Sequence, residues 1–407
     1  MNADDRPIVG FTMLAHAMFH VYELSIPVFV TVWLDVFPTS EATLGVVVGI
    51  GYALIGVGAL PSGVLADTYG SKSLVLVSMA GMGGGFVLVS LAPNVVVLTL
   101  ALMVWGAGAS LYHPAGLSLL SRGAENRGTA LAYHGAAGNV GTVLGPLTAA
   151  LLLAFFEWRV VAVLFVAPAV VGTLVAFGLD FEEVTESDAN QSPEDDSGIS
   201  SLGEFLTDSR SLFTRSFAIV FAIVLLYGLY YRGVLTFLPE ILGDLVIFES
   251  FTLFGRTVTP SRYIYSGLLV VGVFGQYTGG KISDRVETEH ALIVTFGALL
   301  VAAGVFVPAS EAGALPLLTV CALLGFFVYV AAPVYQTKIA ESVASDTHGL
   351  SYGFTYLGMF GIGAMGAAAA GTILTYASTD TLFLGLATLA AVAALLSVLL
   401  RTKEFVP

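Results

Sequence analysis

The stretch Gly63–Lys72, GVLADTYGSK, separates two long apolar runs. Its Gly-x-x-x-Asp pattern recurs in Gly280–Arg285, GKISDR, which begins 217 positions later and again separates two apolar runs. Glycine lets two membrane helices approach closely, and an Asp at a helix end can accept hydrogen bonds from the first turn of a neighbouring helix. A short polar turn of this kind that occurs twice indicates a duplicated membrane protein.

These turns resemble the motif Gly-x-x-x-Asp-x-x-Gly-Arg-Arg/Lys of the major facilitator superfamily of secondary transporters, which lies between helices 2 and 3. Ser71 and Glu287 depart from the family pattern. The resemblance implies an all-α polytopic membrane protein, with twelve helices in two pseudo-symmetric bundles of six. We expect the turns to gate the transporter by meeting helix ends of the opposite half on the cytoplasmic side. The expected gating residues are Gly63, Asp67, Gly70, Lys72, Gly280, Asp284 and Arg285.

The composition independently predicts a membrane protein. Hydrophobic residues make up 57% of the 407 residues, charged residues 11%, and the mean hydropathy is +0.89, which would leave a soluble chain too little polar surface. A spanning helix needs about 20 apolar residues. The runs of suitable length are 9–36, 43–66, 73–92, 94–121, 128–156, 159–179, 215–243, 262–283, 289–308, 314–341, 349–377 and 380–401.

The positive charges predict the orientation. With the N-terminus inside, the tails and the inner connections carry 11 of the 15 Lys and Arg residues, so both termini should be cytoplasmic. The first run is too long and too polar for a cleavable signal peptide and should remain in the mature protein. We therefore expect a multi-pass protein of the plasma membrane.

The chain divides into an N-terminal bundle (1–180), an acidic cytoplasmic linker (181–214) and a C-terminal bundle (215–407). Ten of the 29 acidic residues lie between Asp180 and Asp208, in a segment without apolar periodicity. The net charge of −14 argues against nucleic acid as a partner. The only cysteine, Cys321, allows no disulfide within the chain. We expect a monomer in the lipid bilayer.

A second repeat supports the duplication. Gly106 and Pro114 have the same spacing as Gly325 and Pro333, which follow them by 219 positions. A proline in mid-membrane removes a backbone donor and bends or locally opens its helix. Pseudo-symmetric transporters place their substrate site between the halves near the midplane. The bend at Pro114 is therefore a candidate site, the alternative being a purely structural kink.

Polar residues in the first run are the strongest candidates for a site. His16, His20 and Glu23 are spaced by four and three residues, so they lie along one helix face. Such groups are costly in lipid and should face protein or a water-filled cavity. The alternative is a hydrogen-bonded packing row between helices. We predict no metal site, because nothing in the sequence fixes a third ligand.

The run 128–156 contains His134, Asn139 and the segment Gly141–Pro146, GTVLGP. This segment resembles the antiporter signature Gly-x-x-x-Gly-Pro, which implies export and a close, bent contact between helices 5 and 8. Two departures, Thr148-Ala149 for Gly-Gly and Leu102 where proton-coupled drug exporters carry Arg, weaken that likeness. Together with the helix 1 histidine and the Tyr-His-Pro segment, the pattern resembles the fosmidomycin-resistance branch of exporters. The expected bend residues are Pro114, Gly141, Gly145, Pro146 and Pro333.

Arg232 lies inside an apolar run, where a buried guanidinium needs an anion. Glu23 of the other half is one candidate, and a substrate carboxylate or phosphonate is another; a structural ion pair is the alternative. Glu23, His20 and His113 are the candidates for proton coupling. The expected substrate-binding residues are His16, His20, Tyr112, His113, His134, Asn139, Tyr231, Arg232, Tyr329, Gln336 and Tyr356.

The sequence contains no nucleophile elbow, phosphate loop or zinc spacing, so we expect neither an enzyme nor a cofactor. Three functions remain open. The first is a proton-coupled exporter (antiporter) that moves small organic anions or drugs by alternating access. The second is a proton- or sodium-coupled uptake symporter for a sugar or an organic acid, and the third is a membrane sensor that does not transport. The expected partners are a small-molecule substrate, a coupling ion (a proton) and the bilayer.

Overall fold

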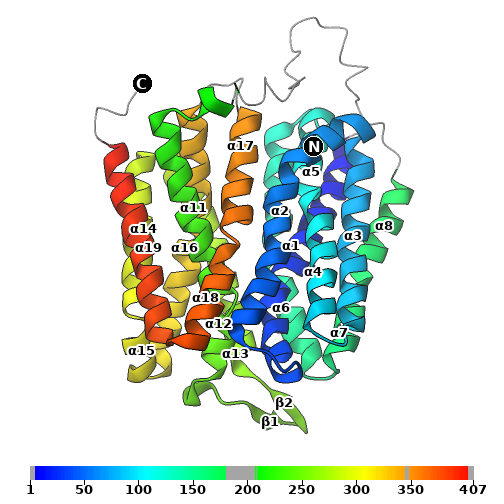
Figure 1. Cartoon of the computed structure of the whole chain (residues 1–407). Helices are drawn as coiled ribbons and strands as arrows, with labels where there is room; N and C mark the ends of the chain where they lie inside the picture. The colour runs from blue at the N-terminus through cyan, green and yellow to red at the C-terminus, as the bar shows by residue number, and fades with distance from the viewer. Residues whose placement is uncertain (1–4, 180–206, 208, 344–347, 402–407) are drawn as a thin grey trace, which may run out of the picture.

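The computed structural model describes residues 5–179, 207, 209–343 and 348–401, and these form two helical halves (Figure 1). Most of the predicted acidic linker lies outside the described residues. The first half contains α1 (Asp5–Val36), α2 (Glu41–Tyr69), α3 (Ser71–Leu91), α4 (Val95–Ser110), α5 (Tyr112–Gly123), α6 (Arg127–Leu153), α7 (Trp158–Leu164) and α8 (Ala167–Gly178).

The second half is also helical, with one short hairpin in the connection after α12. Its elements are α11 (Arg215–Leu235), α12 (Leu238–Gly243), η1 (Val246–Phe248), β1 (Phe251–Leu253), β2 (Arg256–Val258), α13 (Pro260–Ser283), α14 (Thr288–Gly304), α15 (Phe306–Ala312), α16 (Ala314–Ser342), α17 (His348–Tyr356), η3 (Leu357–Ile362), α18 (Met365–Tyr376) and α19 (Thr379–Leu400).

The described helices account for the predicted spans. Ten helices or near-continuous pairs are long and apolar enough to cross a membrane, and the bent pair α14 and α15 adds an eleventh. The remaining predicted span is α13, a helix of 24 residues that packs along α16. The α13 helix carries Arg262, Gln276 and Lys281, which make it more polar than the others. The all-α membrane fold predicted from the sequence is confirmed.

The two turns predicted to be equivalent lie at equivalent places. Gly70 ends α2 with φ at +85°, a conformation that favours glycine, and its N–H donates to the carbonyl oxygen of Ala66. Asp284 follows α13, which forms the second predicted span of its half. Pro114 lies in the first turn of α5, and Pro333 lies inside α16. The two prolines therefore differ, because Pro114 follows a helix break and Pro333 lies within a continuous helix, and the equivalence of the two halves stays a prediction.

The helix interruptions agree only in part with the positions predicted from proline. The fourth span breaks at Leu111, three residues before Pro114, whereas α6 and α16 continue through Pro146 and Pro333. The sequence did not predict the π-helical segment η3 or the 47° bend between α14 and α15. The bend at Val305, like the break at Leu111, lies three residues before a proline, here Pro308, whereas η3 contains no proline.

The packing of α6 corrects one expectation. A Cβ atom at Gly141 or Gly145 would collide with the backbone of Ala17 or Val21, so both glycines serve close packing on α1. The resemblance implied that this segment contacts the eighth helix. The α6 helix does meet α13, but further along, where the Tyr263 hydroxyl donates to the carbonyl oxygen of Ala150 at 3.3 Å.

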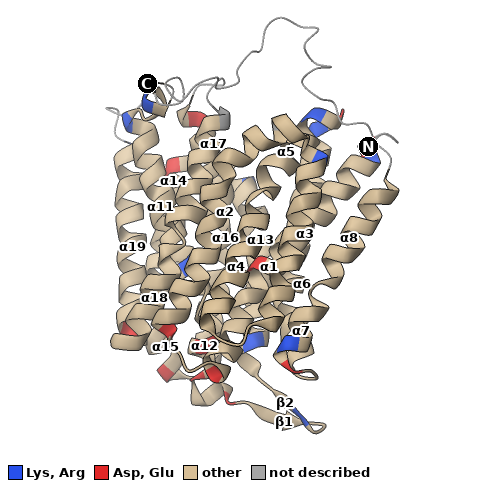
Figure 2. Cartoon of the chain, turned by 45° about the vertical axis from the view of Figure 1, so that its right-hand side comes forward, with Lys and Arg blue, Asp and Glu red and all other residues tan. Residues whose placement is uncertain are grey.

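The molecule has two distinct ends. The terminal face is the end where α1 begins and α19 finishes, and the hairpin face is the end where β1 and β2 protrude (Figure 1). Lys and Arg gather at the terminal face, while Asp and Glu are prominent at the hairpin face (Figure 2). This is the asymmetry on which the predicted orientation rests.

Hydrogen bonds join the two halves near the hairpin face. The Ala42 amide donates to Thr375 Oγ1 at 2.8 Å, and Thr375 in turn donates to Glu41 at 3.0 Å. Arg262 Nε donates to Thr31 Oγ1 at 3.0 Å. The α2 and α18 helices also pack closely on each other, as do α6 and α13. The described structure is therefore closed at the hairpin face.

Candidate functional site

A buried ion pair joins the two halves at the centre of the molecule. Arg232 on α11 donates from Nη2 to Glu23 Oε1 on α1, and the two side chains are 2% and 1% exposed. The Arg232 guanidinium lies 3.6 Å from the centre of the Tyr52 ring on α2, and the Tyr52 hydroxyl donates to the Glu23 carbonyl oxygen at 2.9 Å. A buried charge is tolerated when it is paired and hydrogen-bonded in this way.

A row of hydrogen-bonded histidines starts at the second carboxylate oxygen of Glu23. His20 Nδ1 lies 2.8 Å from Glu23 Oε2, and His20 Nε2 lies 3.2 Å from His16 Nε2. His16 Nδ1 lies 2.8 Å from the carbonyl oxygen of His134, so this nitrogen must carry a proton and donate. The helical spacing of the α1 residues builds this row, and the sequence predicted it.

The end of this histidine row that is farther from Glu23 contacts α5 and α6. The Tyr112 hydroxyl donates to the carbonyl oxygen of Thr12 at 2.7 Å, so His134 Nε2, 2.9 Å from the same hydroxyl, carries a proton and donates to it. The His134 ring stacks on His16 with centroids 4.0 Å apart. A Cβ atom at Gly138 would lie 2.5 Å from the His16 ring, so glycine is what lets this ring lie against α6.

His113 brings the fourth imidazole to the cluster and touches the other half. Its ring lies 5.3 Å from the His16 ring and 4.5 Å from Phe19. On its other side it stacks on Tyr356 of α17, with centroids 5.3 Å apart. His113 Nε2 is buried and has no hydrogen-bond partner among the described residues.

The remaining expected site residues divide into two groups. Tyr231 lies beside the ion pair, with its ring centre 5.2 Å from the Arg232 guanidinium, and its hydroxyl oxygen lies 3.3 Å from that of Tyr329. Gln336 is exposed on α16. Asn139 is half-buried, and no hydrogen bond among the described residues joins it to the histidines. The structure thus brings together the histidines, Tyr112, Arg232 and Tyr356, but not Gln336 or Asn139.

The expected gating residues lie in or beside the turns that follow α2 and α13. Lys72 Nζ donates to the carbonyl oxygen of Leu179, in its own half, at 3.2 Å. Asp284 and Arg285 are exposed. The side chain of Asp67 lies outside the described residues. The gating role of these residues stays a prediction.

Sequence reasoning missed three aromatic residues of the site. Tyr52 supports both members of the ion pair, Phe19 lies against His20 and His113, and Phe360 of η3 has its ring 5.5 Å from the Arg232 guanidinium. Tyr52 is the only aromatic residue in the run 43–66, and this feature of the sequence could have identified it as a candidate site residue. Nothing in the sequence distinguishes Phe19 and Phe360 from other apolar residues of membrane helices.

A comparison with known families identifies the chain. The model of the Major Facilitator Superfamily matches residues 11–367. The chain therefore belongs to this superfamily and is a transporter rather than an enzyme. Its structure resembles that of a mutant of the nucleoside transporter NupG, with a TM-score of 0.77 at 14% identity over 97% of this chain and 100% of that one.

Curated relatives match over shorter regions. The Multidrug resistance protein B homolog of Mycobacterium tuberculosis is 28% identical over 153 residues, which are 37% of this chain and 28% of that protein. The Lincomycin resistance protein of Streptomyces lincolnensis is 34% identical over 113 residues, 27% of this chain and 23% of that protein. The matched region thus spans about a quarter of each relative's length.

Proposed function

We propose that this transporter exports small organic molecules, drugs among them, in exchange for protons by alternating access. The observation that supports this most is the Glu23–Arg232 ion pair, because it places one carboxylate between the two halves where both must move. The names of the resistance relatives and the likeness of Gly141–Pro146 to an antiporter signature also support export. The basic terminal face supports an orientation with both termini in the cytoplasm of a cell whose plasma membrane the protein crosses.

Glu23 is the coupling residue in this proposal. When its carboxylate binds a proton, its attraction to Arg232 falls, and the tie between the halves weakens. His20 hydrogen-bonds to Glu23 and is the adjacent group able to pass a proton to it. His113 extends this route towards Tyr356 of the other half. The charged and titratable groups around Glu23 and His20 include Arg232, Tyr52, Tyr231, Tyr329, His16, His113 and His134.

The ion pair restricts which substrates can be exchanged for protons. Exchange requires that substrate and proton compete for one group. A cationic drug competes with the proton for the Glu23 carboxylate, so it fits exchange. An organic anion would instead bind Arg232, which frees Glu23 to take up a proton, so anion and proton would move together. Cationic drugs are therefore the favoured exported class, ahead of small organic anions.

The same ion pair favours the second candidate function, an uptake symporter for an organic acid. In that function Arg232 binds the acid and Glu23 binds the proton, and both cross in one direction. A sugar, or coupling to sodium, would make no comparable use of the ion pair. In either function the amphipathic side chains of Tyr231, Tyr329 and Tyr356 line the site from the second half.

The test is transport by the purified protein in proteoliposomes that contain a pH-sensitive dye. Cationic drugs, organic anions and sugars are supplied singly, and proton movement is recorded during substrate entry. Export is supported if a cationic drug and protons cross in opposite directions. Movement of an organic anion and protons in the same direction would support the symporter, and transport of every substrate without proton movement would refute coupling.

A further inference from the structure

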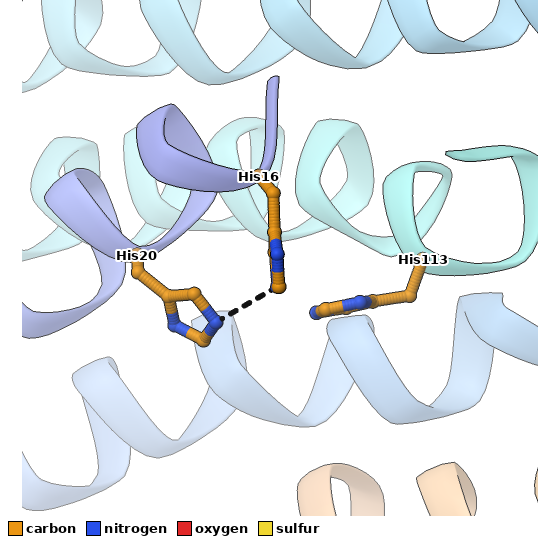
Figure 3. A group of neighbouring side chains, drawn as sticks. All are labelled: His16, His20 and His113. Atoms are coloured by element: carbon orange, nitrogen blue, oxygen red, sulfur yellow. Dashed lines mark hydrogen bonds between the residues drawn. The ribbon is translucent and has the colours of Figure 1, made fainter. Parts of the chain in front are cut away.

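The three histidines His16, His20 and His113 converge from two helices upon one small space (Figure 3). His16 and His20 come from α1, and His113 comes from α5. One ring nitrogen of each lies within 4.8 Å of those of the other two. The sequence predicted no metal site because no third ligand was fixed, and the third ligand is 93 positions from His20 along the chain.

The hydrogen bonds at the Nδ1 atoms of His16 and His20 determine the protonation of the two facing Nε2 atoms. His16 Nδ1 faces a carbonyl oxygen, and His20 Nδ1 faces a carboxylate held by Arg232, so both Nδ1 atoms donate. If both rings are neutral, both Nε2 atoms then present lone pairs to each other at 3.2 Å. Two lone pairs repel at that distance, so a positive species must lie between these nitrogens.

The surroundings are those of a metal site. Histidine ligands of metals donate their other ring N–H to a carbonyl oxygen or a carboxylate, and His16 and His20 each do one of these. Two ligand nitrogens about 2.0–2.1 Å from a tetrahedral Zn²⁺ lie about 3.3 Å apart, close to the observed 3.2 Å. The Nε2 atoms of His16 and His20 therefore already have the spacing of two zinc ligands.

His113 supplies an independent observation. Its side chain is 8% exposed, and its Nε2 atom has no hydrogen-bond partner among the described residues. A buried polar atom without a partner is costly, and a metal ion would satisfy it. Its ligand nitrogen needs to approach the other two by at most about 1.5 Å to reach tetrahedral spacing.

We propose that His16, His20 and His113 bind a divalent transition-metal ion of the Zn²⁺ type. Imidazole nitrogens suit Zn²⁺, Co²⁺ and Ni²⁺ rather than Mg²⁺ or Ca²⁺. Three histidines leave the fourth position of a tetrahedral ion for water or an anionic group. The ion takes the place of a proton shared by His16 and His20, so it blocks the histidine route to Glu23.

The experiment measures metal binding by the whole chain, purified in detergent without chelator. Zn²⁺ binding is followed by calorimetry, and X-ray absorption of the Zn²⁺-loaded wild type counts the imidazole ligands. We expect one ion per chain with three imidazoles. His16→Gln, His20→Gln and His113→Gln should each weaken binding by more than about tenfold. The matched control is His290→Gln, because the His290 side chain on α14 is 44% exposed and pairs with Glu287, away from the three ligands. This variant should bind Zn²⁺ like the wild type.

Two results would overturn the proposal. One is the absence of Zn²⁺ binding to the wild type, which would leave a shared proton as the species between His16 and His20. The other is binding that all three variants retain, or fewer than three imidazoles in the wild-type spectrum, a result that needs no variant to fold. The proposed transport function is measured separately in proteoliposomes, so either proposal can fail while the other stands.

Discussion

Glu23 and Arg232 allow the central ion pair to be tested by a double-mutant cycle. Glu23→Gln leaves the Arg232 guanidinium buried without a counter-charge, and Arg232→Gln does the same to the carboxylate. Both side chains are at most 2% exposed, so water cannot replace the missing partner. Removing one partner of a buried pair costs about 3–5 kcal/mol. Each single variant should therefore be less stable than the wild type.

The double variant should recover much of this loss. Two glutamine amides carry no charge and can hydrogen-bond to each other, so the cost of an unpaired buried charge disappears. We expect the double variant to be less destabilised than the sum of the single variants by about 2–3 kcal/mol.

The assay is unfolding in detergent, followed by the fluorescence of the three tryptophans under conditions in which refolding is shown to be reversible, so that free energies of unfolding can be compared. The matched control is Glu157→Gln. Glu157 pairs with Arg159 at 3.5 Å, but the two side chains are 54% and 40% exposed, so this change should cost less than about 1 kcal/mol. Single variants as stable as the wild type, or a strictly additive double variant, would refute the ion pair as a structural tie.

Three further predictions follow from single contacts. Gly141→Ala should lower the unfolding temperature because its Cβ meets the α1 backbone, whereas Gly135→Ala on the same helix, with nothing within 4 Å, should be neutral or gain up to about 1 kcal/mol; equal effects would contradict the packing argument. Tyr52→Phe should cost about 1 kcal/mol in thermal unfolding by losing its bond to Glu23, and Tyr52→Leu should cost more by also losing the ring beneath the guanidinium; equal losses would show that the ring contributes nothing. Asp67→Asn should slow transport in proteoliposomes while expression stays nearly intact, and unchanged transport would remove its gating role.

The sequence predicted the fold well because its signals are local or repeated. Apolar runs of about 20 residues define spans directly, and the two Gly-x-x-x-Asp turns order them into halves. The prediction was weaker where tertiary packing decides the geometry. The π-helical segment Leu357–Ile362 contains no proline, and Pro146 and Pro333 do not end their helices. The bend before Phe306 lies three residues before Pro308, in a run where no bend was predicted.

The site was predictable along one helix but not across helices. The spacing of His16, His20 and Glu23 placed them on one face, and the structure joins them by hydrogen bonds. Arg232 was correctly considered a partner for Glu23 because a buried guanidinium needs an anion. Which further residues reach this row depends on how closely α6 packs on α1, and no spacing rule relates Tyr52 to it.

The central claim, that Glu23 couples substrate movement to protons, is tested most directly by the Glu23→Gln variant in proteoliposomes. Accumulation of a transported cationic drug against its gradient is driven by an imposed pH difference, and exchange of labelled for unlabelled drug is measured without one. The account predicts that Glu23→Gln abolishes the pH-driven accumulation but retains the exchange. Accumulation at the wild-type level by the variant would contradict it.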